Sequence, residues 1–155
     1  MQIHIRPAKR EDAGRMMELI HELAVFEKEP EAVTVSMEHF VENGFGKNVV
    51  WKAWVAEIKE SEVTEPWIAG FALYYDRYST WKGRRLYLED LIVTEHMRGK
   101  GLGKLLFETL LDIAKKENYS GMAWQVLDWN EPAIRFYQKY KASIEDGWLN
   151  CNINF

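Results

Sequence analysis

The sequence predicts a mixed α/β (α+β) fold in a single domain that spans residues 1–155. Two observations support this prediction. Segments rich in Val, Ile, Trp and Tyr fill much of residues 49–79 and predict two antiparallel strands. A strand, a glycine-rich turn, a helix and another strand then follow over about 40 residues, which is the order of a βαβ unit with two parallel strands. The expected central sheet is antiparallel at its N-terminal strands, parallel around the glycine turn and flanked by helices.

The N-terminal half contains one strand and two helices before the antiparallel pair. Residues 2–6 alternate between polar and apolar types and predict a strand. Residues 9–28 carry apolar side chains at helical spacing, and residues 35–45 predict a short helix that ends at Asn43-Gly44. The two strands that follow span residues 49–59 and 67–79, with a polar loop between them.

The C-terminal half continues with a strand at 85–93 and, after the glycine turn, a helix at 101–117. Residues 121–127 predict the parallel strand of the βαβ unit. A short helix is predicted at 130–140, with Asn130 as its N-cap and Pro132 in its first turn. Residues 147–155 predict a last strand.

The composition limits the classes of function. The net charge of −4 argues against a general nucleic-acid binder, because such proteins neutralise phosphates with Lys and Arg. No apolar run approaches the roughly 18 residues of a membrane span, and the first residues lack an apolar signal core. Cys151 is the single cysteine, so we expect no disulfide, no metal site and a cytoplasmic location.

Residues 98–103, with the sequence RGKGLG, join an apolar strand to an apolar-periodic helix. Backbone N–H groups at a glycine turn that opens a helix form an anion site, and Arg98 adds positive charge to it. The spacing matches neither the P-loop of nucleotide-binding proteins nor the G-x-G-x-x-G fingerprint of dinucleotide-binding proteins. It suits a pyrophosphate, and a plain βα turn without a ligand stays open as the alternative.

Two carboxylates and a tyrosine are candidates for acid–base chemistry. Glu89 and Asp90 interrupt the apolar strand LYLEDLIV, and strand alternation is expected to send them to opposite faces of the sheet. Desolvation would raise the pKa of a carboxyl there, which suits a general base. The alternative is a structural role, such as a pair with Arg84 or Arg85. Tyr137 shares a helix face with apolar residues, so its spacing alone favours a core tyrosine.

The loop pattern R/Q-x-x-G-x-G/A between a strand and a helix resembles the acetyl-CoA loop of the GNAT acetyltransferases. Other segments match in order: IRPA near the N-terminus, LAVFE (23–27), ENGFG (42–46), GFALYY (70–75), LYLEDLIV (86–93), RGKGLG (98–103), WNEPAIRFYQK (129–139) and EDGW (145–148). Together they cover nearly the whole chain and are similar to the spermidine/spermine N-acetyltransferase branch of that superfamily.

This resemblance implies the GNAT fold, with acetyl-CoA as co-substrate. It implies that Glu89 relays the proton of the amine, directly or through water, and that Tyr137 is the general acid near the CoA sulfur. The donor-binding residues that it implies are Leu91, Ile92 and Val93 in the strand, Arg98, Gly99, Lys100, Gly101, Leu102, Gly103 and Lys104 in the loop, and Asn130. The substrate-side residues that it implies are Glu27, Trp81, Asp90 and Trp148.

The expected function is direct transfer of acetyl from acetyl-CoA to a primary amine of a small cationic acceptor, without an acyl-enzyme. Ser79 and Thr80 stand where the polyamine enzymes carry an acidic residue before the tryptophan, so a diamine or a lysine- or thialysine-like amino acid fits at least as well as a polyamine. A non-catalytic acyl-CoA sensor is the alternative. We expect neither nucleic acid nor membrane as a partner. The family forms homodimers, and we expect one here although the sequence stops at Phe155 without the family's C-terminal extension.

Overall fold

The protein is described by a computed structural model that covers all of residues 1–155. Two 3-10 turns, η1 (Arg10–Asp12) and η2 (Glu95–Met97), accompany the regular elements. In chain order these are β1 (Gln2–Pro7), α1 (Ala13–Phe26), α2 (Met37–Phe45), β2 (Lys52–Lys59), β3 (Trp67–Ser79), β4 (Gly83–Val93), α3 (Leu102–Lys116), β5 (Met122–Ala123) and α4 (Glu131–Gln138).

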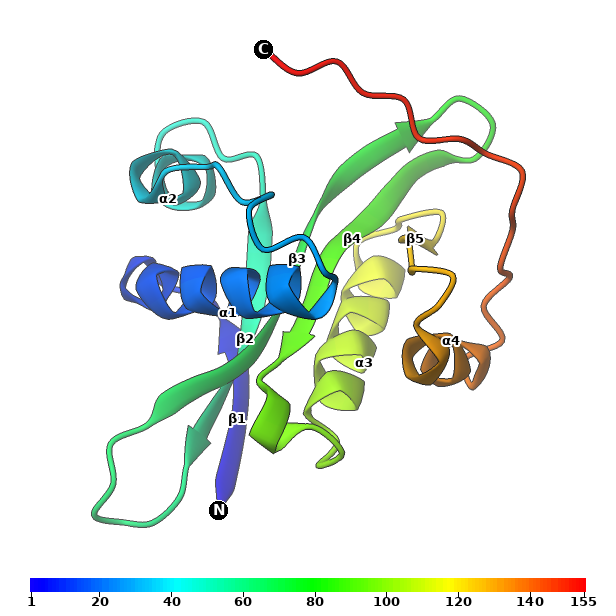
Figure 1. Cartoon of the computed structure of the whole chain (residues 1–155). Coiled ribbons are helices and arrows are strands. Elements are labelled where there is room, and N and C mark those ends of the chain that lie inside the picture. The colour runs from blue at the N-terminus through cyan, green and yellow to red at the C-terminus, as the bar shows by residue number, and fades with distance from the viewer. The chain divides into compact units, whose positions relative to one another are not determined.

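The strands form one mixed sheet in the order β1-β2-β3-β4-β5. Strands β1 to β4 pair antiparallel, each with the next, and β4 pairs with β5 in parallel (Figure 1). The predicted mixed sheet is therefore confirmed. The parallel pair is short, because it joins only Leu86 to Met122 and Tyr87 to Ala123. From Leu88 onward, β4 pairs with β3 alone.

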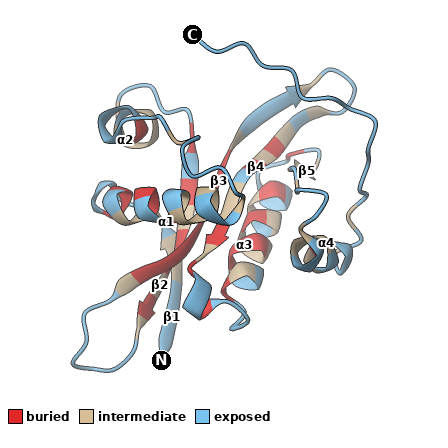
Figure 2. Ribbon diagram, viewed as in Figure 1, coloured by how far each residue is buried: buried red, intermediate tan, exposed pale blue.

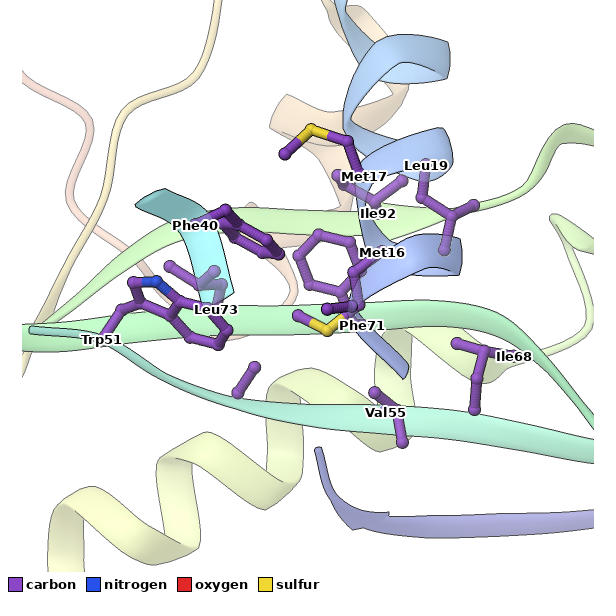
Figure 3. Close-up of a cluster of buried hydrophobic side chains, with 12 residues drawn as sticks. Met16, Met17, Leu19, Phe40, Trp51, Val55, Ile68, Phe71, Leu73 and Ile92 are labelled. Carbon is purple, nitrogen blue, oxygen red and sulfur yellow. The ribbon is translucent and has the colours of Figure 1, made fainter. Parts of the chain in front are cut away.

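Helices cover both faces of this sheet. On one face, which we call the α1 face, α1 and α2 pack over a buried cluster that includes Met16, Phe40 and the β3 residues Phe71 and Leu73 (Figure 3). Helix α3 lies against the opposite face (Figure 3). Its apolar side chains, among them Leu106 and Phe107, are buried. Figure 2 shows the buried residues gathered along the central strands and the helix sides that face them. Strand alternation sends neighbouring residues of β3 to these two layers in turn.

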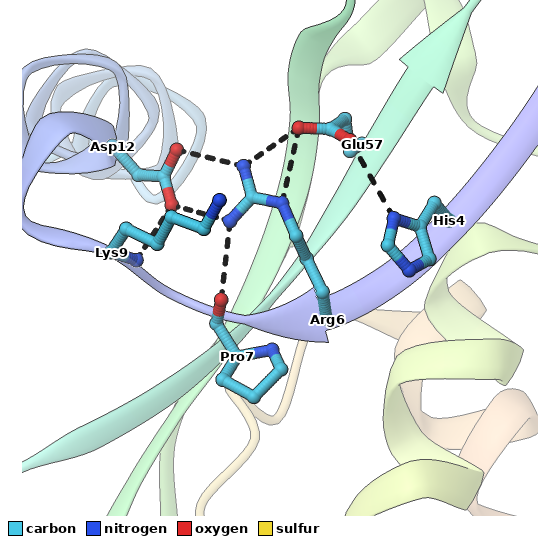
Figure 4. Close-up of polar contacts among 6 residues, drawn as sticks. All are labelled: His4, Arg6, Pro7, Lys9, Asp12 and Glu57. Carbon is cyan, nitrogen blue, oxygen red and sulfur yellow. Dashed lines mark hydrogen bonds and ion pairs between the residues drawn. The ribbon is translucent and has the colours of Figure 1, made fainter.

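Arg6 of β1 ties the first strand to the start of α1 and to β2 (Figure 4). Its guanidinium donates to the two carboxylate oxygens of Asp12, at 2.8 and 3.0 Å, and to Glu57 Oε2 at 2.7 Å. Burial would raise the pKa of Asp12, but hydrogen bonds from Arg6 and from the Lys9 amide, with the charge of Arg6, outweigh it and lower that pKa. This network fixes the N-terminal end of α1, the helix that ends beside Glu27.

Two compact units divide the chain, residues 1–124 and residues 125–155. The first contains the whole sheet with α1, α2 and α3, and the second contains α4 and the C-terminal segment. The single domain over residues 1–155 stays a prediction.

Two predicted strands differ from the structure. Residues 121–127 form only the two-residue strand β5, and residues 147–155 form no strand at all. The alternating apolar pattern of 147–155 predicted a strand, but strand formation also requires a partner for the backbone N–H and C=O groups. No strand pairs with this segment in the structure.

Candidate active site

A β-bulge in β4 decides where the two candidate carboxylates point. Leu73 of β3 pairs with Asp90 and the next residue of β3 pairs with Leu88, so Glu89 is an extra residue in β4. Asp90 therefore lies on the α1 face, opposite Leu73. Glu89 accepts a hydrogen bond at 2.7 Å from the hydroxyl of Tyr75, which alternation places on the same face as Leu73. The prediction that the two carboxylates point to opposite faces was wrong, because the bulge resets the alternation.

Three carboxylates gather at this point of the α1 face. Glu27 directly follows α1, and its negative charge acts on Asp90, as does that of Glu89. Asp90 is half-buried, and burial followed by these two charges raises its pKa to about 7. Burial also raises the pKa of Glu27. The cluster combines three predicted site residues from two elements, and its electrostatics favour a positively charged ligand.

The neighbouring arginines do not neutralise this cluster. Arg84 donates to Asp76 at 2.8 Å, and Arg85 donates to two backbone carbonyls near β5 at 3.3 and 3.1 Å. The alternative in which Arg84 or Arg85 pairs with one of the strand carboxylates is therefore wrong.

Two tyrosines and an arginine extend the α1 face away from the carboxylates. The ring of Tyr75 lies 5.3 Å from the ring of Tyr87, and the guanidinium carbon of Arg77 lies 5.4 Å from the centre of the Tyr87 ring. Burial, together with the hydrogen bond to Glu89, raises the pKa of Tyr75. Sequence reasoning missed these three residues. They occupy every second strand position and so lie on the same face as Leu73 and Glu89. The pairing register of β3 and β4 is therefore the signal that could have found them.

The glycine turn between β4 and α3 has the backbone geometry of an anion site. Gly99 and Gly101 have φ angles of +76° and +85°, a left-handed conformation that residues with side chains rarely adopt. Gly101 is the N-cap of α3, and its carbonyl accepts from the Leu105 amide at 3.1 Å. The amides of residues 102–104 lie before the first hydrogen-bonded amide of the helix, that of Leu105. The helix therefore provides no carbonyl acceptor for them, and their N–H groups are available to an anion at the helix N-terminus.

One backbone edge of β4 has no pairing strand where it leads to this turn. The Thr94 amide donates to the Ala69 carbonyl of β3 at 2.8 Å. Because bonding direction alternates along an antiparallel strand, the backbone of Ile92 also faces β3, whereas that of Leu91 and Val93 faces the other edge. No strand covers this second edge, since the pairing with β5 ends earlier.

The charged residues of the turn have separate contacts. Arg98 Nε donates to the Val93 carbonyl at 2.9 Å, and its guanidinium carbon lies 5.0 Å from the centre of the Phe26 ring. Lys100 Nζ lies 3.8 Å from Met97 Sδ. Lys104 is exposed in the first turn of α3. Positive charge thus surrounds the helix N-terminus without a carboxylate bound to it.

Glu22 of α1 anchors the segment that precedes the turn. Its carboxylate accepts from the Thr94 hydroxyl at 2.9 Å and from the Glu95 amide at 2.8 Å. Sequence reasoning missed this residue, because the two partners lie more than 70 positions away in the chain. The contact fixes the end of β4 against the helix that carries Glu27.

Trp81 lies apart from the carboxylates within one chain. It occupies the turn between β3 and β4 and is 89% exposed, and its amide donates to Ser79 Oγ at 3.2 Å. Ser79 is six residues from Leu73, the partner of Asp90, and six strand residues span about 20 Å. The structure does not bring Trp81 to the other substrate-side residues of the sheet.

The remaining predicted residues lie in the unit of residues 125–155. Asn130 Oδ1 accepts from the Ala133 amide at 3.4 Å, which confirms the predicted N-cap of α4. Tyr137 is buried, and burial raises its pKa to about 12; its ring lies 5.3 Å from that of Phe136. Trp148 is 84% exposed and belongs to no helix or strand.

No group of three or more His, Cys, Asp or Glu side chains is arranged to hold a metal ion. None of the helices is both long enough and apolar enough to cross a membrane.

The family assignment agrees with the glycine turn and the mixed sheet. Residues 15–141 match the model of the acetyltransferase (GNAT) family. The chain belongs to the GNAT acetyltransferase family. The matched range contains β4, the glycine turn, α3 and the whole of α4 with its cap.

Similar proteins of known name indicate the branch of the GNAT family to which this chain is related. The thialysine N-epsilon-acetyltransferase of Bos taurus is 38% identical over 151 residues, which cover 94% of this chain and 89% of that protein. The spermidine/spermine N(1)-acetyltransferase-like protein 1 of Homo sapiens is 33% identical over 148 residues, which cover 93% of this chain and 21% of that protein. The predicted superfamily, its branch and the prediction of an N-acetyltransferase are confirmed.

Solved structures confirm the GNAT fold. An aminoglycoside acetyltransferase from an uncultured soil metagenomic sample superposes with a TM-score of 0.75 over 99% of this chain and 96% of that chain, at 17% identity. A possible acetyltransferase from Clostridium difficile superposes with a TM-score of 0.75 over the full length of both chains, at 22% identity. These likenesses concern the fold alone.

Proposed function

We propose that this GNAT protein transfers the acetyl group of acetyl-CoA directly to a primary amine of a small cationic acceptor, such as a diamine, a polyamine or a lysine- or thialysine-like amino acid. One observation carries the proposal: β4 presents at Leu91 and Val93 a backbone edge that no strand covers, directly after the carboxylates Glu89 and Asp90. The edge suits the donor and the carboxylates suit an ammonium group. The relatives named thialysine N-epsilon-acetyltransferase support an amine acceptor.

In this proposal the glycine turn binds the pyrophosphate of acetyl-CoA. The amides of residues 102–104 and the positive end of α3 attract an anion, and Arg98, Lys100 and Lys104 add positive charge around it. The open edge of Leu91 to Val93 can hydrogen-bond the amide groups of the pantetheine arm in the manner of an added strand. Asn130 contributes a contact to CoA in addition to its cap.

Acetyl-CoA supplies an acetyl group that is activated as a thioester. The acceptor must first lose a proton, because an alkylammonium with a pKa of about 10.4 is protonated at neutral pH. Glu89 takes this proton, directly or through water, while Asp90 and Glu27 hold the cationic acceptor. The amine nitrogen then bonds to the acetyl carbon, and the C–S bond breaks with its electron pair on sulfur. The nitrogen releases its second proton and the thiolate takes one up, so the reaction yields the amide, the CoA thiol and one proton.

Tyr137 is the proposed donor to the leaving sulfur. Its pKa of about 12 keeps the phenol protonated at neutral pH. A complete proton transfer to a thiolate whose pKa is about 8.5 would cost roughly 5 kcal/mol, at 1.36 kcal/mol per pH unit. We therefore assign Tyr137 a hydrogen bond to the sulfur, which stabilises the negative charge as it develops there.

Trp81 and Trp148 are proposed to contact a cationic acceptor through their exposed indole faces. Because Trp81 lies about 20 Å along the strand from the carboxylates, it serves either the far end of a long acceptor or the site of a second copy. A homodimer in the cytoplasm, with neither nucleic acid nor membrane as a partner, is part of the proposal. Light scattering of the purified protein tests the dimer.

Release of free CoA thiol from acetyl-CoA, measured across diamines, polyamines and lysine analogues, tests the activity. Glu89→Gln and Tyr137→Phe should each lower kcat by about a hundredfold, while calorimetric binding of CoA stays unchanged. Tyr78→Phe is the matched control, because Tyr78 is a 76% exposed tyrosine of β3. A protein that binds acetyl-CoA but releases no thiol with any amine would be a sensor, and the proposal would be abandoned.

A further inference from the structure

A continuous row of side chains on the α1 face joins the carboxylates to a cation. Tyr75 donates to Glu89 Oε2 at 2.7 Å, the rings of Tyr75 and Tyr87 lie 5.3 Å apart, and the Arg77 guanidinium carbon lies 5.4 Å from the centre of the Tyr87 ring. The row therefore has a negative end at Glu89, an aromatic middle and a positive end at Arg77. A surface of this kind is complementary to a ligand with opposite charges at its two ends.

Arg77 differs from every other arginine of the chain. Each of the others donates a hydrogen bond or forms an ion pair, either with a carboxylate or with a backbone carbonyl. Arg77 is exposed and has only its contact with the Tyr87 ring. Asp76, the acid next to it in sequence, is already bound by Arg84 and by the hydroxyl of Tyr119. The guanidinium donors of Arg77 are thus available to an anionic group of a ligand.

The spacing along the strand limits the length of such a ligand. Glu89 and Tyr87 are two residues apart in β4, which separates their positions by roughly 7 Å. Arg77 pairs with Arg85, four residues from Glu89 and so roughly 13 Å along the strand, but its guanidinium carbon lies 5.4 Å from the centre of the Tyr87 ring. The two charged ends are therefore separated by roughly 7–13 Å. An extended chain of five bonds, each about 1.5 Å long, spans roughly 6–7 Å. This is the separation between the side-chain amine and the α-carbon of a lysine-like amino acid. The carboxylate carbon lies one bond further, and a charge-assisted hydrogen bond of about 2.8 Å at each charged end extends the reach into the range between Glu89 and Arg77.

We propose that Arg77 is a specificity-determining residue that binds the carboxylate of the acceptor, and that the preferred acceptor is an amino acid with a side-chain amine. The inference rests on the proposed function, because it assigns the other end of the same acceptor. The amine lies at the carboxylate cluster, the aliphatic chain crosses the faces of Tyr75 and Tyr87, and the carboxylate meets the guanidinium. A diamine or polyamine brings a second cation toward Arg77 and is repelled.

Two pairs of acceptors that differ only in the carboxylate test this inference: L-lysine against 1,5-diaminopentane, and L-ornithine against 1,4-diaminobutane. The wild-type protein should acetylate the amino acid of each pair with the higher kcat/KM. Arg77→Gln should reduce the ratio between amino acid and diamine by about tenfold, the worth of one charge-assisted hydrogen bond. Arg77→Lys should retain part of the preference, because it keeps the charge but loses the planar fork.

Lys82→Gln is the control, since it removes one positive charge from the neighbouring turn, outside the row. An unchanged ratio in Arg77→Gln, an equal fall in Lys82→Gln, or a wild-type preference for the diamines would each overturn the inference while leaving the amine acetyltransferase intact. Absence of thiol release with every amine would overturn the proposed function itself, so the two failures are distinguishable.

Discussion

Replacing Asp90 by Asn should stabilise the folded protein at pH 8 and change its stability little at pH 4. Asp90 is half-buried in β4, where burial and the charges of Glu89 and Glu27 raise its pKa from 3.8 to about 7. In the unfolded chain the carboxyl has its ordinary pKa. Above pH 7, folding therefore places a charged carboxylate where charge is disfavoured. Asn has almost the same shape and no charge, so it removes this penalty.

The sign and size of the effect follow from the two pKa values. Below pH 3.8 both states hold the proton and the penalty is absent. Between pH 3.8 and 7 the folded state keeps a proton that the unfolded chain has released, so stability falls as the pH rises. Above pH 7 the penalty is constant at no more than about 4 kcal/mol, since the pKa values differ by about three pH units of 1.36 kcal/mol each. At pH 5 it is roughly 1.5 kcal/mol.

Urea unfolding of the wild type and Asp90→Asn at pH 5 and pH 8 measures the difference. The gain in the free energy of unfolding should be larger at pH 8 by up to about 2.5 kcal/mol. Asp112→Asn, which removes an exposed carboxylate from α3, is the control for net charge and should show no such pH dependence. An equal gain at both pH values, or a loss of stability at pH 8, would refute the electrostatic account of the cluster.

Three further results are expected. Gly101→Ala should lower the free energy of unfolding by about 1–2 kcal/mol and weaken CoA binding, because Gly101 has a left-handed φ of +85°. Gly14→Ala, in open space on α1, is the control and should be neutral or stabilising. Equal effects of the two substitutions on CoA binding in calorimetry and on stability in urea unfolding would contradict this expectation. Arg6→Met should destabilise the protein by about 3–5 kcal/mol at pH 7, because it leaves the carboxylates of Asp12 and Glu57 without the cation that pairs with them. That loss should shrink as the pH falls below 4, since the lowered pKa of Asp12 contributes stability only above its unfolded value; a pH-independent loss in urea unfolding would count against the ion pairs. The KM of a cationic acceptor should fall as the pH rises from 6 to 8, because Asp90 gains its negative charge over this range. A KM that does not change with pH in steady-state kinetics would exclude Asp90 from acceptor binding.

The local periodicity of the sequence predicted most elements of the fold. The helical spacing in α1 and α3 persists in the structure because each pattern matches one buried face. The alternation of residues 2–6 also forms the predicted strand, β1, although none of its residues is fully buried; its pairing with β2 holds it in the sheet. Residues 147–155 have the alternation of a strand but form none, since pairing depends on a neighbour that the local pattern does not specify. The shortening of β5 to two residues has the same origin.

The candidate site was predicted less completely, because its geometry depends on register. Glu89 and Asp90 stood out as carboxylates in an apolar strand, but their common face follows from the bulge opposite Leu73, which no residue pattern announces. Tyr75 and Arg77 could not be selected until β3 was paired with β4. The glycine turn was predictable from the sequence alone, because left-handed φ angles at Gly99 and Gly101 are a local requirement.

The bulge and the early end of the parallel pair act together on one stretch of β4. After Tyr87 the strand loses β5, which opens one backbone edge, and two residues later the extra residue Glu89 turns two consecutive carboxylates to one face. The edge runs perpendicular to the face, so a donor hydrogen-bonded along the edge and an acceptor held on the face approach the same residues without competing for the same atoms. A regular strand would offer one of its carboxylates to the opposite layer, packed under α3, where a cationic acceptor has no access. In the proposed function, the irregularity of β4 is therefore what allows one short strand to bind both substrates.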